Sequence, residues 1–195
     1  IFHLNTTSAQ DYGDLQYALS GYSYRSVGPA FMSGRIADIA IDSNNENVWY
    51  VAVGSGGVWK TKNAGTTWMP LTDNMPFYST GSITIDPNDS SRIWVGTGEN
   101  VAGRHVGIGH GIYLSKDSGS TWDNMGLKKS EHISKIIVHP DNSDIIWVAS
   151  QGPLWNSGGD RGLFMSNDGG NTWSNKLYVN EWTGVTDIII DPTNP

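Results

Sequence analysis

The residues that could do chemistry in this 195-residue chain gather in glycine-rich loops between short apolar segments. Two carboxyl groups facing one cleft could hydrolyse a glycosidic bond, and loop tryptophans could stack on sugar rings or grip a peptide. Spacing alone brings no two carboxyl groups into one cleft, so we predict no catalytic residue and interpret the set as ligand-binding candidates. These candidates are Glu99, Arg104, His105, His110, Glu131, His132, Trp155, Asp160, Arg161 and Trp182.

The sequence does not indicate a metal or a cofactor. His105 and His110 share one glycine-rich loop, but the chain has no cysteine. Only the distant Glu99 or His132 is available as a third zinc ligand. Acidic turn residues such as Asp117 lack the alternating oxygen ligands of a calcium loop. We therefore predict no metal site and no cofactor.

Three similar turns must position these loops. Each turn reads hydroxyl-x-Asp/Asn-x-Gly-x-Thr-Trp, at residues 61–68, 115–122 and 166–173. The Asp or Asn side chain is expected to accept hydrogen bonds from backbone amides two residues on, and the glycine supplies a positive φ. The tryptophan is expected to begin the returning strand and to bury its indole under the turn. The structural residues are Asn63, Gly65 and Trp68, then Asp117, Gly119 and Trp122, then Asp168, Gly170 and Trp173.

Apolar segments surround each turn and predict short strands. One set ends in Asp or His at a turn: residues 39–42, 83–87, 136–140 and 188–192. A second set follows at 48–52, 93–96 and 145–149, and an aromatic-bearing third set precedes each motif at 58–60, 112–114 and 163–165. His139 takes the place of the turn Asp, so we expect it to be a structural hydrogen-bonding residue. With the motif tryptophan opening strand D, the unit is four strands, A to D.

Four-stranded antiparallel units of this length predict an all-β fold, a segment of a β-propeller, rather than a β-helix with its shorter rungs. We predict about three complete blades and the start of a fourth, as the N-terminal part of a larger propeller. The expected parts are an extension at 1–23, a strand at 24–33 that closes an absent last blade, blades at 34–75, 76–129 and 130–180, and a truncated blade at 181–195.

Antiparallel strands sort the loops onto two faces. The A–B and C–D turns share one face, where they are short and alike. The B–C and D–A loops share the other, where lengths differ and all ten candidates lie. Insertions on one face of a repeat scaffold usually mark the binding side.

Composition limits the partners. The formal net charge of −7 argues against nucleic acid or an anionic membrane surface as the main partner. No apolar run approaches 18 residues, so we predict no membrane insertion. The aromatic content, with nine Trp and eight Tyr, suits short strands joined by tight turns.

The turn motif resembles the Asp-box, or BNR repeat, of sialidases, xyloglucanase-type glycosidases and sortilin-like receptors. The wider pattern includes residues 24–29, 33–36, 56–61, 96–99 and 161–164. With these segments, the chain is similar to the sortilin-like (VPS10-like) propellers of large exported bacterial proteins. This resemblance implies a secreted or cell-surface protein.

The resemblance also bears on activity. In xyloglucanase-like relatives, a catalytic Asp precedes a Gly-Gly-aromatic segment of the first blade, and Gly54 takes that place here. Arg35 weakly resembles one member of the sialidase arginine cluster. We therefore expect a non-catalytic binding or scaffold propeller that recognises protein, peptide or glycan, with a polypeptide as first choice. The alternatives are a carbohydrate-active hydrolase, glycosidase or sialidase-like, completed by missing blades, and an architectural module whose edges another chain completes.

Overall fold

The computed structural model describes residues 35–100, 106–191, 193 and 195. The described residues belong to one compact unit, Ser33–Pro195. The extension at 1–23, the closing strand at 24–33, and the candidates Arg104 and His105 lie outside the described residues.

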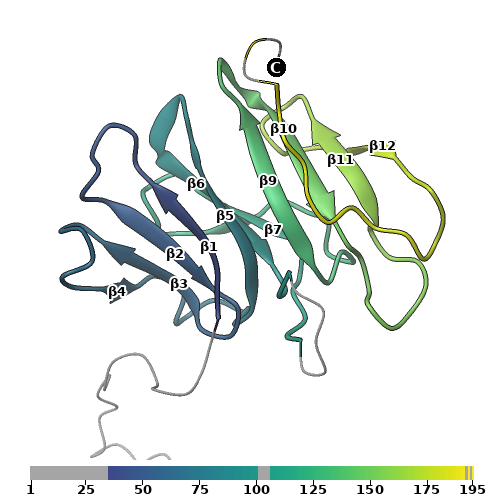
Figure 1. The fold of residues 1–195 in the computed structure, drawn as a ribbon, viewed down its shortest axis with the longest axis horizontal. Coiled ribbons are helices and arrows are strands. Elements are labelled where there is room, and N and C mark those ends of the chain that lie inside the picture. Colours follow the sequence, from purple (N-terminus) through teal and green to yellow (C-terminus); the bar gives the residue numbers. More distant parts are fainter. Residues whose placement is uncertain (1–34, 101–105, 192, 194) are drawn as a thin grey trace, which may run out of the picture. The chain divides into compact units, whose positions relative to one another are not determined.

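In the part of the chain that the structure describes, twelve strands form three antiparallel sheets of four strands each, as the sequence predicts (Figure 1). The first sheet contains β1 (Ile36–Ile41), β2 (Trp49–Val53), β3 (Gly57–Thr61) and β4 (Met69–Pro70). The second contains β5 (Thr80–Asp86), β6 (Asp89–Thr97), β7 (Ile112–Ser115) and β8 (Asp123–Asn124). The third contains β9 (Ile133–His139), β10 (Asn142–Ser150), β11 (Gly162–Ser166) and β12 (Ser174–Leu177). Strands within each sheet are paired in chain order, which is the topology of a propeller blade.

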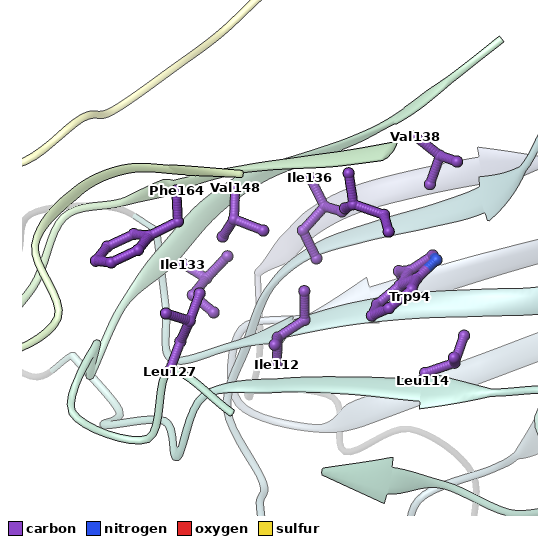
Figure 2. Packing of buried hydrophobic residues seen from close by; sticks show 10 residues of the cluster. Trp94, Ile112, Leu114, Leu127, Ile133, Ile136, Val138, Val148 and Phe164 are labelled. Atoms are coloured by element: carbon purple, nitrogen blue, oxygen red, sulfur yellow. The ribbon is translucent and has the colours of Figure 1, made fainter. Parts of the chain in front are cut away.

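Strand alternation buries the middle sheet on both faces. Successive side chains of a strand point to opposite faces. Ile93 and Val95 of β6 therefore pack into a core cluster with the first sheet. Trp94 between them packs into a second cluster with the third sheet, together with Ile136 and other residues shown in Figure 2. Two separate cores thus join the three sheets.

The outer strands depart from the prediction at two places. Strand D begins one residue after the motif tryptophan, and Trp68 keeps 40% of its surface exposed while Trp122 and Trp173 are half-buried. The indoles therefore lie beside the turns rather than fully beneath them. Ile188–Ile190 form no ladder in the described residues, because no described strand offers their backbone a partner. They line a pocket with Ile137 and Trp147 instead.

The motif turns close through their own side chains. Asp117 accepts hydrogen bonds from the amide of Thr121 (2.8 Å) and from its hydroxyl (2.6 Å), four residues on rather than two. The Ser115 hydroxyl donates to Asp117 and accepts from the amide of Gly119 at 2.8 Å. The 166–173 turn repeats this arrangement. The carboxylates of Asp117 and Asp168 thus accept from amides four residues on, where the sequence predicts amides two residues on.

His139 acts as its sequence position predicts. Its Nδ1 accepts a hydrogen bond from the amide of Asp141 at 3.1 Å. Asp42 and Asp86 accept from the amides two residues on in the equivalent turns, each at 2.9 Å. His139 is therefore a turn residue of the A–B face.

No helix in the described part of the chain could cross a bilayer.

Candidate active site around Glu99

The loop that follows β6 places Glu99. Gly98 connects the strand to this residue with φ +84°, and a Cβ on Gly98 would lie 1.8 Å from the carbonyl oxygen of Glu131. Only glycine fits so close an approach. The Gly98 amide donates to the carbonyl of Ser79 at 2.8 Å, which fixes the direction of the turn. The backbone therefore directs Glu99 toward the first sheet.

The Glu99 carboxylate lies between two polar groups of the first blade. Arg35 donates to Oε2 through its guanidinium, and the Ser55 hydroxyl donates to Oε1 at 2.6 Å. The Glu99 side chain is only 3% exposed, whereas that of Arg35 is 57% exposed. Burial of a carboxylate is costly unless it is paired and hydrogen-bonded, and both oxygens are satisfied here. Glu99 is thus a buried carboxylate with both oxygens hydrogen-bonded, and its partner Arg35 is exposed to solvent.

Gly54 leaves the space that this carboxylate occupies. A Cβ built on Gly54 would lie 3.0 Å from Oε1 of Glu99. The resemblance to xyloglucanase-like proteins assigns a catalytic Asp to the position of Gly54. A carboxylate from the second blade therefore lies at the place where the first blade lacks one.

His132 supports Glu99 from behind. Its Nδ1 lies 2.9 Å from the carbonyl oxygen of Glu99, and the ring is completely buried. This burial lowers the pKa of His132, an effect larger than the opposing hydrogen bond to Glu99. The neighbouring residue Glu131 contributes its carbonyl, which accepts from the amide of Gly109 at 2.7 Å. Glu131 and His132 therefore lie beside Glu99, with His132 holding its backbone.

Arg161 organises a second part of the same face. Its guanidinium donates to five backbone carbonyls, at distances from 2.5 to 3.2 Å. An arginine has five N–H donors, so none is left for a ligand. The carbonyls belong to Gln151, Pro153, Asn156, Gly158 and Trp182.

Arg161 ties two exposed aromatic candidates to neighbouring loops. Trp155 lies in the bound loop with 58% of its surface exposed, and Trp182 keeps 62% exposed. Asp160 accepts from the amide of Lys129 at 2.9 Å, which closes the base of that loop. These residues form a group in the third blade, and within the described residues no hydrogen bond or ion pair joins them to Glu99.

His110 belongs to no metal-binding group among the described residues. His110 is exposed, and its amide donates to the Thr97 hydroxyl at 2.7 Å. The described residues contain no group of three His, Cys, Asp or Glu side chains that could hold an ion.

Sequence reasoning missed the partners of Glu99. Arg35 and Ser55 are 64 and 44 residues away from it along the chain. A signal was present in the resemblance: a glycine stands where relatives carry a carboxylate, and the B–C loops of neighbouring blades meet on one face. That combination could have predicted that the loop carrying Ser55 meets Glu99.

Known proteins similar to the chain include several xyloglucanases. A xyloglucanase of Hypocrea jecorina is 26% identical over 191 residues, covering 91% of this chain and 21% of the relative. An oligoxyloglucan-reducing end-specific xyloglucanase of Emericella nidulans is 25% identical over 155 residues, covering 73% and 18%. The chain thus spans about a fifth of the length of the curated relatives it matches. No family model matches the chain.

Solved structures agree on the propeller fold. An ancestral GH74 enzyme superposes with a TM-score of 0.62 at 20% identity, covering 80% of this chain and 20% of that one. A GH74 enzyme of Niastella koreensis gives a TM-score of 0.54 at 25% identity, covering 70% and 20%. YCF48 of Cyanidioschyzon merolae gives 0.52 at 16% identity, covering 78% and 40%.

These similarities correct the expectation of a non-catalytic binding or scaffold propeller, which is wrong. Xyloglucanases recur among the relatives by sequence and GH74 enzymes among those by structure, so a glycoside hydrolase is the better interpretation. The absence of a carboxylate at Gly54 does not imply the absence of catalytic activity. A position along one strand does not reveal which side chain of the next blade fills the same space. What the comparisons establish for this chain is a β-propeller with glycoside-hydrolase relatives.

Proposed function

We propose that the chain is part of a glycoside hydrolase that acts on a glucan of the xyloglucan type. The observation that carries this proposal is the placement of the Glu99 carboxylate beside Gly54, where a Cβ would come within 3.0 Å of Oε1. The similarity to xyloglucanases supports the substrate class. A polysaccharide partner is too large to enter a cell intact, which supports an exported or cell-surface location.

Glu99 would be the carboxylate that this part of the protein contributes. Glycosidases generally use two carboxyl groups, one as acid and the other as base or nucleophile. Both oxygens of Glu99 accept hydrogen bonds, from Arg35 and Ser55. That arrangement suits the base or nucleophile, because a hydrogen-bond donor is already directed at each carboxylate oxygen. The acid would come from another part of the protein, about 5–10 Å away depending on whether configuration is retained or inverted.

A set of variants tests this role through hydrolysis of xyloglucan. Glu99→Gln preserves size and one acceptor, so we expect the rate to fall by about 10²–10⁴-fold with little loss of stability. Glu46→Gln, in an exposed turn on the opposite face, is the matched control and should keep full activity. Full activity in Glu99→Gln would show that the Arg35–Glu99 pair only joins two blades.

Relocating the carboxylate sharpens the test. The three atoms nearest to a Cβ at position 54 all belong to the Glu99 side chain, so Glu99→Ala removes the closest obstacle to Gly54→Asp. We expect Glu99→Ala alone to be inactive and Glu99→Ala with Gly54→Asp to recover part of the activity. If the folded double variant recovers no activity, a carboxylate at this place is not sufficient, and the activity requires Glu99 itself.

We also propose the finer assignments of the scaffold. The three motif turns would be Asp-box turns, which their repeated hydroxyl–carboxylate–amide hydrogen bonds support. Blades would span 34–75, 76–129 and 130–180, with a further blade beginning at 181–195. The sortilin-like resemblance would then concern this scaffold rather than the activity. Unfolding of single-blade variants, followed by hydrogen exchange, would test these boundaries.

A further inference from the structure

A pocket of about 320 Å³ lies on the loop face of the first blade, outside the group around Glu99. Its walls include Gly56, Gly57, Asp73, Met75, Phe77 and Tyr78. The B–C loop and the D–A loop of the blade meet here, because the amides of Gly56 and Gly57 donate to the carbonyl of Tyr78 at 3.2 and 2.8 Å. The pocket is therefore formed by fixed backbone.

The aromatic side chains of the pocket are held in different ways. Phe77 is buried and packs on Tyr113, with ring centroids 4.6 Å apart. Tyr78 keeps 62% of its surface exposed although its backbone is anchored. A rigid ring with an accessible surface can accept an apolar ligand face at low entropic cost.

Asp73 supplies a polar group beside these rings. It is exposed, and within the described residues its carboxylate has no hydrogen-bond or ion-pair partner. A free carboxylate next to an exposed aromatic ring matches a hexopyranose, whose C–H face is apolar and whose edge carries hydroxyl donors.

The chain connects this pocket to the candidate catalytic carboxylate. Gly56 directly follows Ser55, whose hydroxyl donates to Glu99 at 2.6 Å. A sugar in the pocket would therefore lie against the same loop that holds Glu99. We propose that the pocket is a subsite for one hexopyranose unit of the glucan; this proposal rests on the proposed glycoside hydrolase function for its substrate class.

Binding of a xyloglucan oligosaccharide, measured by calorimetric titration of the protein, tests the subsite. Tyr78→Ala and Asp73→Asn should each weaken binding by about tenfold, because one stacking surface or one charged hydrogen bond is lost. Tyr178→Ala is the control for the first, since Tyr178 has a similar exposure of 59% and does not line the pocket. Asp141→Asn, on the A–B face, is the control for the second. Both controls should change the affinity less than about twofold.

Hydrolysis separates this proposal from the proposed function. Glu99→Gln should lose hydrolysis while it keeps oligosaccharide binding. In a protein that also carries the remaining blades, binding that depends on Tyr78 and Asp73 without any hydrolysis would overturn the proposed function and leave the subsite standing. Hydrolysis that depends on Glu99, with unchanged affinity in Tyr78→Ala and Asp73→Asn, would overturn the subsite alone. Binding of tetramethylammonium instead of the sugar would also overturn it and identify a cation pocket.

Discussion

Strand β2 of the first sheet carries Tyr50 where β6 of the second carries Trp94, and each side chain meets the motif turn of the following sheet. The Tyr50 hydroxyl donates to the carbonyl of Ser118 at 3.3 Å, and the Lys60 ammonium donates to the same carbonyl at 3.0 Å. Lys60 also lies 4.7 Å from the centre of the Tyr50 ring. The first interface therefore uses polar contacts to a turn carbonyl.

The second interface uses packing at the same place. Trp94 is fully buried, and a Cβ on Gly170 would lie 2.5 Å from the indole. The turn thus presents a glycine surface to an aromatic ring. The indole Nε1 has no partner among the described residues, so this contact depends on shape and apolar burial.

The repeat therefore determines the position of the contact between neighbouring blades, whereas the contact itself can be polar, as at Tyr50, or apolar, as at Trp94. Burial raises the pKa of Tyr50 and lowers the pKa of Lys60, both chiefly through desolvation. Desolvation therefore costs free energy in both interfaces, at Tyr50 and Lys60 in the first and at the unpaired Nε1 of Trp94 in the second, but Trp94 buries the larger side chain. We expect the second interface to contribute more stability than the first.

Trp94→Ala should give the largest loss of stability. Removing a fully buried indole leaves a cavity, so we expect about 3–5 kcal/mol of destabilisation in urea unfolding. Tyr50→Phe removes only one hydroxyl at the equivalent position and should cost about 0.5–1.5 kcal/mol. Equal losses of unfolding free energy in Trp94→Ala and Tyr50→Phe would contradict a difference in stability between the two interfaces.

Gly170→Ala should have an intermediate effect, measured as a shift in the unfolding midpoint. Gly170 and Gly158 both have positive φ, +88° and +80°, but nothing lies within 4 Å of a Cβ on Gly158. Gly158→Ala therefore reports backbone strain alone, about 1–2 kcal/mol. Gly170→Ala adds the contact with Trp94, and we expect about 1–3 kcal/mol more. The same loss at both sites would mean that the indole can move aside.

Acid should have the smallest effect, and it should act on the turns rather than on Tyr50 or Trp94. The Thr121 hydroxyl, then its amide, lowers the pKa of Asp117 from 3.8 to about 2, and Thr172 does the same for Asp168. Ionised carboxylates favour the folded state, so this contribution is complete above pH 3.8 and is lost as the pH falls toward about 2.

The first turn provides an internal reference for that experiment, because Asn63 occupies the equivalent position and does not titrate. Changing Asp117 and Asp168 to Asn should flatten the dependence of unfolding free energy on pH in this range. An unchanged slope in the double variant would assign the acid sensitivity to other carboxylates.

The sequence predicts the candidate site only in part. Glu99, Glu131 and His132 were all identified as candidates, and the structure brings them together. The sequence could not show that the His132 ring faces the Glu99 backbone, because burial of an imidazole depends on the neighbouring blade. For Arg161 the sequence suggests ligand binding, because it is a cation in a variable loop. In the structure, five backbone carbonyls use all its donors.

The four-stranded unit and the motif turns could be predicted from the sequence alone. These depend on local chemistry: strand alternation, a short acidic side chain, and a glycine with positive φ. The tertiary structure alone decided that Arg35 and Ser55 meet Glu99, across 64 and 44 residues. Such contacts depend on which loops neighbouring blades bring to one face, and no local pattern encodes that pairing. The scaffold was therefore readable along the chain, whereas the candidate active site appeared only between blades.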